Sequence, residues 1–369
     1  MHIKTSESVF RGHPDKVCDQ VADGILDAIL AQDKEARVAI ECLIKDDLFV
    51  IAGEVTTTAL VDYILEARRI LDDIGYDGDS YRFITKISAQ SSDIKKGVDA
   101  LGAGDQGIMY GYATNETEEC LPLPYLLIRN IAKRMDEVNR KHPNIFGLDG
   151  KCQVSIVYND QDKAVHASTI VVSAQTKPGV NRSVYEPFIN EVIKAVVPEN
   201  LIDESTLILI NPTGEFVKGG SYADSGLTGR KLQVDSYGTL VPHGGGAFSG
   251  KDYTKVDRSG AYYCRYVAKA IVKAGLADSA EVSVAYAIGV PFPVATNVKA
   301  VGSKYSNDEL RKIINKVFDF SPVSIIRELK LIEGTYRQLS EYGHFGWKSC
   351  RWEVINEELI VKIKETING

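Results

Sequence analysis

The chain has 369 residues, of which 44% are hydrophobic, so it can bury a large core and is long enough for two or three domains. Its formal net charge of −7 argues against a general nucleic-acid-binding or membrane-surface protein, because such proteins usually present a basic face to phosphate groups. The N-terminal residues MHIKTSESVF lack an apolar signal region and no apolar run is long enough to span a bilayer, so a cytoplasmic protein is predicted.

The N-terminal part of the chain predicts a helix, a hairpin, a second helix and a strand. Apolar residues recur at helical spacing from Val17 to Ile29, which predicts a helix over 15–31. Two alternating strands follow at 36–44 and 48–55, joined by a polar turn. A helix at about 57–73 and a strand at 81–89 complete this unit.

The same order of elements recurs further along the chain. The second unit is expected to comprise a helix at 123–140, strands at 152–158 and 164–173, a helix at 183–196 and a strand at 206–210. The third is expected to comprise a helix at 259–275, strands at 281–289 and 294–301, and a helix at 307–318 capped by Asn307.

This repeat predicts an α+β protein of three structurally similar domains, with mixed or antiparallel sheets because the hairpins exclude a doubly wound parallel sheet. We place the domains at residues 1–100, 101–217 and 218–369, and strands can be exchanged between them. Alternation of helices and hairpins is common in α+β proteins, so the repeat is a hypothesis at this point. Glycine-rich segments join the units, and functional residues are expected there.

The first candidate site is the sequence GHPDK, which places His13, Asp15 and Lys16 at the start of the first helix. A helix N-terminus attracts anions, an aspartate can ligate a divalent cation, and a histidine can donate to a phosphate or a leaving oxygen. An ordinary helix start, with an early proline and an aspartate cap, explains the same residues.

Two further segments combine glycines with charged side chains. GAGDQGIMYGYATNET, at 102–117, carries Asp105 between glycines, which suits either an amine-binding site or a tight loop. The second segment, at 211–235, has the sequence NPTGEFVKGGSYADSGLTGRKLQVD. It carries the adjacent pair Arg230 and Lys231 after several glycines, a pattern typical of anion binding or of a solvated surface. Lys151 follows Asp149 in a stretch that reads as a turn when taken alone.

The most informative segment is HGGGAFSGKDYTKVDRSG, at 243–260. Its glycines allow backbone N–H groups to approach phosphate oxygens, Lys251 and Lys255 supply positive charge, and Asp257 can bind a hard cation. It is not a Walker A motif, because Asp252 stands where a hydroxyl residue would ligate Mg²⁺. Together with the other segments it favours a nucleoside triphosphate enzyme that uses Mg²⁺.

These motifs, in this order, closely resemble those of the S-adenosylmethionine synthetase family, also called methionine adenosyltransferases, from Thr5 to Phe345. The resemblance implies three α+β domains around a pseudo-threefold axis, and a homodimer or homotetramer with active sites between subunits. It also implies the reaction: the sulfur of L-methionine attacks C5′ of ATP, and the displaced tripolyphosphate is hydrolysed to pyrophosphate and phosphate.

The resemblance further implies roles for individual residues. The residues expected to contact the leaving oxygen or stabilise the triphosphate charge are His13, Lys151, Arg230, Lys231 and Lys251. The residues expected to complete the ATP site are Asp149, Phe216, Asp224 and Ala247. The residues expected to bind methionine are Glu54, Gln90, Asp105, Asp224 and Lys255. The expected metal ligands are Asp15 and Asp257 for two Mg²⁺ ions and Glu41 for K⁺, although Glu41 also fits a solvent-facing strand residue.

The chain departs from the family pattern at several places. Arg11 stands where an acidic residue is common, and Glu215 stands where a basic residue is common. The stretch from Gln90 to Gly107 resembles the family's mobile lid. Within it, the segment 97–105 is shorter than in many relatives. Asp252 has no assigned role. Two alternatives to the methionine adenosyltransferase reaction stay open: an ATP-dependent small-molecule kinase and a non-catalytic nucleotide-binding regulator of the same family.

Overall fold

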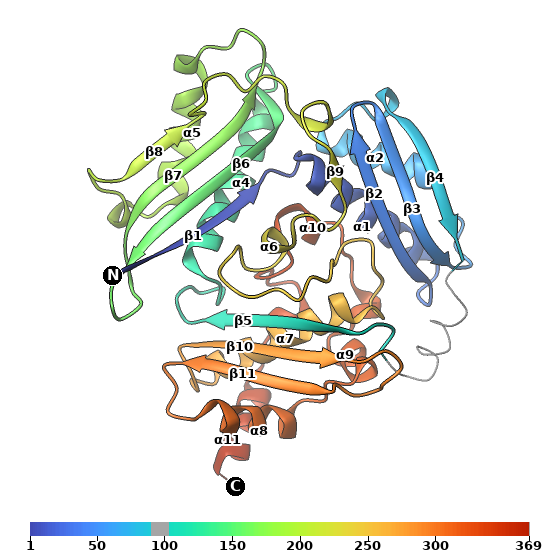
Figure 1. The fold of residues 1–369 in the computed structure, drawn as a ribbon, viewed down its shortest axis with the longest axis vertical. Helices are drawn as coiled ribbons and strands as arrows, with labels where there is room; N and C mark the ends of the chain where they lie inside the picture. Colours follow the sequence, from blue (N-terminus) through green and yellow to red (C-terminus); the bar gives the residue numbers. More distant parts are fainter. Residues whose placement is uncertain (90–102, 369) are drawn as a thin grey trace.

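The fold contains three sheets arranged around a common centre (Figure 1). The computed structural model describes residues 1–89 and 103–368. The first sheet has the order β4-β3-β2-β9, with β4 at Arg82–Ser88, β3 at Leu48–Thr56, β2 at Arg37–Lys45 and β9 at Gly226–Leu227. The second has the order β1-β6-β7-β8, with β1 at His2–Val9, β6 at Phe146–Tyr158, β7 at Ala164–Thr176 and β8 at Leu207–Ile210. The third has the order β11-β10-β5, with β11 at Ala295–Val301, β10 at Ser279–Tyr286 and β5 at Gly107–Thr114.

The sheets are antiparallel or mixed, which confirms the predicted α+β class. The β3–β4 and β7–β8 pairs are parallel, and the other strand pairs are antiparallel. Strands also cross between the units of the sequence. β1 joins the second sheet, β5 joins the third and β9 joins the first. These crossings bring segments distant in sequence to one sheet edge.

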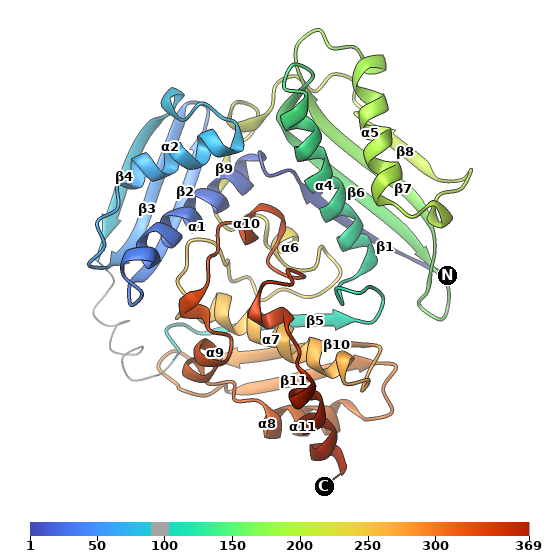
Figure 2. The same cartoon turned by 180° about the vertical axis from the view of Figure 1, so that it is seen from behind.

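Helices cover one face of each sheet. Figure 1 shows the strands in front, and Figure 2, from behind, shows the helices in front of them. The helices over the first sheet are α1 at Pro14–Gln32 and α2 at Tyr63–Ile74, and those over the second are α4 at Leu123–Lys141 and α5 at Arg182–Val196. The helices of the third unit are α7 at Val256–Lys273 and α8 at Asn307–Val317. The other α-helices in the described part of the chain are α6 at Leu232–Asp235, α9 at Pro322–Glu328, α10 at Leu339–Tyr342 and α11 at Glu357–Asn368.

One predicted cap is wrong. Ser306, and not Asn307, caps α8, because its hydroxyl accepts the backbone N–H of Glu309 while the Glu309 carboxylate accepts the backbone N–H of Ser306. The side chain of Asn307 instead accepts the N–H of Ala300 in β11.

Across the described residues, no helix is both long and apolar enough to cross a lipid bilayer.

The sheet faces opposite the helices carry exposed apolar side chains. β2 alternates between buried residues such as Ile40 and more accessible ones such as Leu43, as expected for a strand covered on one side. Ile84 in β4, Ile108 in β5 and Leu207 in β8 are each at least half exposed. Exposed apolar side chains on these sheet faces make the faces candidates for an interaction surface.

Four aspartates on α1 hold distant segments of the chain. Asp15, Asp19, Asp23 and Asp27 recur every four residues, so they lie along one side of the helix. Their carboxylates accept backbone N–H groups from Leu227, from Gly229, from Gly250, and from Tyr336 and Arg337, in that order. We call these residues the α1 aspartates.

The ion pair between Asp23 and Arg258 is buried within this arrangement. Both side chains are inaccessible to solvent, and both carboxylate oxygens of Asp23 lie 2.7 Å from the guanidinium. Asp23 also fixes Gly250, whose φ of 79° and close approach to the Ile40 carbonyl exclude a larger residue.

We therefore expect Asp23→Ala to lower the free energy of unfolding by about 3–5 kcal/mol, because it leaves the buried guanidinium of Arg258 unpaired. Urea unfolding at a fixed protein concentration measures this. The control is Asp308→Ala, which removes an exposed partner of Arg311 and should change the urea midpoint little. If the two substitutions lowered the free energy of unfolding equally, the buried pair would have no special role in stability.

Candidate active site

The first group of predicted residues gathers at the N-terminus of α1. His13 is the N-cap: its Nδ1 accepts the backbone N–H of Asp15 at 3.2 Å, and Pro14 occupies the first helical position. The cap is therefore the histidine and not the aspartate considered from the sequence. Because Nδ1 accepts a hydrogen bond, the neutral ring carries its proton on Nε2, which leaves a donor for a ligand.

His13 is held in its neutral form. Burial, followed by the nearby ammonium of Lys231, lowers the pKa of His13 to about 4. Asp15, Asp224 and Lys151 also act on the ring electrostatically, so these predicted residues lie around it. We call His13, Asp15, Asp149, Lys151, Asp224, Arg230 and Lys231 the α1 cluster.

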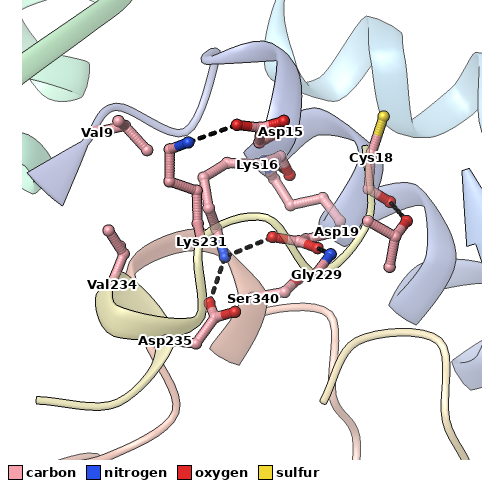
Figure 3. Close-up of polar contacts among 12 residues, drawn as sticks. Val9, Asp15, Lys16, Cys18, Asp19, Gly229, Lys231, Val234, Asp235 and Ser340 are labelled. Atoms are coloured by element: carbon pink, nitrogen blue, oxygen red, sulfur yellow. Dashed lines mark hydrogen bonds and ion pairs between the residues drawn. The ribbon is translucent and has the colours of Figure 1, made fainter. Parts of the chain in front are cut away.

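The carboxylate of Asp15 is fully buried and is surrounded by donors. It hydrogen-bonds the ammonium of Lys231 at 2.5 Å (Figure 3). It also accepts the N–H of Leu227 at 2.9 Å, and the guanidinium of Arg230 lies 3.6 Å away. Lys151 pairs with Glu7 of the neighbouring strand β1 at 3.0 Å. The cluster thus gathers three cationic side chains at a helix N-terminus, an arrangement that suits a polyanion.

The loop at residues 216–220 carries Phe216 and contacts the side chain of Asp149. The Asp149 carboxylate accepts the N–H of Gly220 at 2.9 Å, and burial raises the pKa of Asp149 to about 6. The carbonyl of Phe216 accepts the N–H of Thr176 at 2.8 Å. Asp149 is carried by β6, and Phe216, whose ring is expected at the adenine, is carried by the loop at residues 216–220, which is attached to β6 and β7.

Lys16, which the sequence placed in the anion site, is instead a buried lysine that lies beneath the cluster and does not face a ligand. Lys16 is inaccessible to solvent and donates to Asp19 at 3.0 Å and to Asp235 at 2.5 Å (Figure 3). Burial opposes its charge, but the two carboxylates outweigh burial and raise the pKa of Lys16. Asp19 also accepts the N–H of Gly229 at 2.8 Å, directly before Arg230. The four-residue spacing of the α1 aspartates is the sequence signal that could have indicated a buried carboxylate partner for Lys16.

The second group lies where the glycine-rich loop meets α7. Lys251 pairs with Asp257 at 2.5 Å and forms a β-bridge with Ala39 of β2. Lys255 pairs with Asp252 at 2.8 Å. Asp105 is exposed, and the neighbouring Gly107 lies close to the Asp257 carboxylate.

Asp252 and Arg11 both have structural partners. The Asp252 carboxylate accepts the N–H of Val38 at 2.7 Å, which attaches the glycine-rich loop to β2 and orients Lys255. Arg11 is buried and pairs with Asp73 at 2.9 Å.

A pocket of about 260 Å³ brings together four predicted residues on the uncovered side of β2 and β3. It is lined by Glu41, Glu54, Ala247 and Lys251, and both glutamates are exposed to solvent. Ala247 lies against Gly229, so the glycine-rich loop touches the segment that carries Arg230 and Lys231. Gln90 lies outside the described residues, as does the rest of the expected lid up to residue 102.

The two groups lie along the same edge of β2. β9 pairs with Leu43 and Ile44, and Lys251 pairs with Ala39 on the same strand. Within residues 1–89 and 103–368, no group of three or more histidine, cysteine or acidic side chains is arranged to hold a metal ion. Asp15 and Asp257 each hold a lysine ammonium instead.

Comparisons with known proteins cover nearly the whole chain. Residues 1–97, 100–216 and 218–354 match the family models described as the N-terminal, central and C-terminal domains of S-adenosylmethionine synthetase. The chain is also similar to the S-adenosylmethionine synthase of Petrotoga mobilis, with 46% identity over 393 aligned positions that cover 98% of this chain and 97% of the relative.

The environment of His13 predicts its titration. We expect its ring to titrate near pH 4, because burial and the Lys231 ammonium disfavour the imidazolium form. NMR of the protein with ¹³C-labelled histidine measures this, and a His13→Asn variant assigns the signal. A midpoint near 6.5, the ordinary value of histidine, would show that the ring is not held as described.

Proposed function

The chain belongs to the S-adenosylmethionine synthetase family, and from this we propose that it converts ATP, L-methionine and water to S-adenosylmethionine, pyrophosphate and phosphate. The methionine sulfur forms a bond to C5′ of ATP while the bond from C5′ to the triphosphate oxygen breaks. Water then cleaves the tripolyphosphate. The single observation that carries this proposal is the α1 cluster, in which a neutral histidine stands among Lys151, Arg230 and Lys231 at a helix N-terminus.

The proposed chemistry requires stabilisation of the leaving group and not a general base. A thioether sulfur is uncharged and has no proton to lose, so the barrier falls when the reacting atoms are aligned and the charge on the departing oxygen is stabilised. The Nε2–H of His13 can donate to that oxygen without giving up a positive charge. Lys231 and Arg230 are positioned by Asp15 before any substrate arrives.

The donor chemistry of the site fits hard cations. The carboxylates of Asp15 and Asp257 each hold an ammonium group at 2.5 Å, so each accommodates a positive charge, and carboxylate oxygens are the ligands that Mg²⁺ prefers. We propose these residues for Mg²⁺ and the exposed Glu41 for K⁺. Bound Mg²⁺ would neutralise charge on the triphosphate.

The pocket of about 260 Å³ on the uncovered side of β2 and β3 is the proposed methionine site. Glu54 faces it beside Lys251, and Lys255 lies in the same loop, so a carboxylate and ammonium groups are available for the two charges of an amino acid. Asp105 and Gln90 are proposed to complete this site. Asp149, Phe216, Asp224 and Ala247 are proposed to bind the nucleoside part of ATP.

We propose that two copies of the chain pack their uncovered sheet faces together, as a homodimer or a homotetramer. The half-exposed Ile84, Ile108 and Leu207 support this, because association would remove apolar surface from water. We further propose that a neighbouring copy contributes to the active site, as the resemblance to the family implies.

Product analysis separates this proposal from its alternatives. With ATP, methionine, Mg²⁺ and K⁺, the purified protein should form S-adenosylmethionine, pyrophosphate and phosphate in equal amounts, measured by chromatography and phosphate assays. Formation of ADP would indicate a kinase. Nucleotide binding without turnover would indicate a regulatory member of the family.

The residue assignments are tested by two substitutions. We expect Lys251→Ala and Asp15→Asn each to lower kcat by about 100-fold or more, because each removes charge that the site uses in the transition state. Steady-state kinetics measure the effect, and Lys163→Ala, in an exposed turn of the second sheet, is the control. Near-normal rates in both variants would overturn the assignments while leaving the family intact.

A further inference from the structure

The imidazole of His344 is buried, and no step of the proposed reaction uses it. His344 belongs to the sequence YGHFG, follows α10 and is inaccessible to solvent. Burial, followed by the nearby charge of Arg258, lowers the pKa of the His344 ring well below the ordinary value of histidine. The ring is therefore neutral and has one N–H donor and one acceptor nitrogen.

The contacts of the ring decide which nitrogen carries the proton. Nδ1 lies 2.7 Å from the hydroxyl of Tyr262, in α7. Burial raises the pKa of Tyr262 well above its ordinary value, so the hydroxyl keeps its proton, and among the described residues it has no other acceptor than Nδ1. The hydroxyl therefore donates to Nδ1, because the opposite arrangement would leave a buried O–H unpaired. The ring proton then lies on Nε2.

Nε2 lies beside the carboxylate of Asp235. It is 3.8 Å from Oδ1, and it makes no hydrogen bond within the described part of the chain. The backbone N–H of His344 also donates to the carbonyl of Asp235 at 2.9 Å. The separation of 3.8 Å exceeds a hydrogen bond, but in an interior without water an N–H dipole still favours a nearby carboxylate. His344 thus contacts Asp235 through both its backbone and its ring.

Asp235 connects this ring to the cations of the α1 cluster. Its carboxylate accepts the ammonium of Lys16 at 2.5 Å, and Lys16 also donates to Asp19 (Figure 3). Asp19 holds the N–H of Gly229, directly before the two adjacent cations. The backbone N–H of Asp235 donates to the carbonyl of Lys231 at 2.9 Å. A displacement of Asp235 would therefore reach the phosphate-binding side chains.

The same ring contacts the second group of the candidate site. Tyr262 stands on α7, which carries Asp257 in its first turn. The ring of His344 also packs against Phe248 of the glycine-rich loop, with centroids 5.0 Å apart and planes inclined by 73°. Phe248 lies shortly before Lys251 in this loop. One buried side chain therefore contacts the segments that carry the charged residues of both groups.

We propose that His344 is a positioning residue of the active site, which holds the α1 cluster and the Lys251–Asp257 pair at a fixed separation. Nε2 is directed to Asp235 while Tyr262 holds Nδ1. The triphosphate chain must meet cations of both groups at once, so a change in their separation would weaken the stabilisation of the leaving oxygen. The role in catalysis rests on the proposed function, whereas the state of the ring does not.

Two amide substitutions separate the Nε2 donor from simple packing. In His344→Gln the amide nitrogen can take the place of Nε2, whereas in His344→Asn it can reach only the place of Nδ1. We expect kcat to fall at least about tenfold in His344→Asn and to stay within about threefold of the wild type in His344→Gln. Urea unfolding should show similar losses of stability in both. Equal kcat values in the two variants would overturn the positioning role.

A smaller change removes a single hydroxyl. Tyr262→Phe leaves Nδ1 without its donor, so the ring proton is no longer confined to Nε2, and kcat should fall about threefold or more. The matched control is Tyr263→Phe, at the next position of α7, whose buried hydroxyl donates to Glu328 at 2.6 Å and not to the ring. Its kcat should equal that of the wild type. An equal fall in the two variants would assign the effect to packing and overturn the proposal.

NMR of the protein with ¹⁵N-labelled histidine observes the ring directly, and His344→Gln assigns its signals. We expect a protonated Nε2 and an unprotonated Nδ1. The Nε2 signal should shift when ATP and Mg²⁺ are added without methionine, whereas the signals of His142, at the C-terminal end of α4, should not.

These spectra distinguish a failure of the proposal from a failure of the proposed function. A protonated Nδ1, or an Nε2 signal that does not respond to ATP, would overturn the role of His344 even in a protein that forms S-adenosylmethionine. A wild-type protein that forms none would contradict the proposed function, and the response of Nε2 to ATP would still decide whether His344 is coupled to the nucleotide site.

Discussion

The buried carboxylates of α1 are the constraint on which the candidate site depends. Asp15, Asp19 and Asp23 accept backbone N–H groups from Leu227, Gly229 and Gly250, and Asp27 accepts those of residues 336–337. The helix therefore fixes the segment before Arg230, the glycine-rich loop and a C-terminal segment at once. Burying so many carboxylates is costly unless each is satisfied. Lys16 and Arg258, both inaccessible to solvent, supply the compensating charge.

The same arrangement prepares the site electrostatically. Arg230 and Lys231 follow the anchored Gly229, and Lys16 links α1 to Asp235 one helical turn beyond Lys231. The cationic groups are thus oriented by ion pairs and hydrogen bonds before a substrate binds. Preorganised charge stabilises a leaving group more effectively than side chains that must first reorient. His13 adds a donor that stays neutral because burial lowers its pKa to about 4.

The sequence was informative where periodicity or long motifs were present. Alternation in β2 and β3 and the helical spacing of α1 predicted those elements to within a residue or two, and the motifs from GHPDK to the glycine-rich loop indicated the family that the comparisons confirm. The strand crossings of β1, β5 and β9 could not be predicted, because pairing between distant segments leaves no local pattern. The cap at Ser306 was missed for a local reason, since serine and asparagine are both good caps. Lys16 was taken as part of the anion site, but it is wholly buried. The assignments of substrate and metal ligands to individual residues stay predictions.

The most direct test of this account is the turnover number of Asp19→Ala. This residue touches no proposed substrate position, but its carboxylate holds both Gly229 and Lys16. If the α1 aspartates position the phosphate-binding cations, kcat should fall by about 100-fold in a protein that still unfolds cooperatively, because small displacements of positioned groups have effects of that order. A kcat within twofold of the wild-type value would show that Arg230 and Lys231 are positioned by something other than α1.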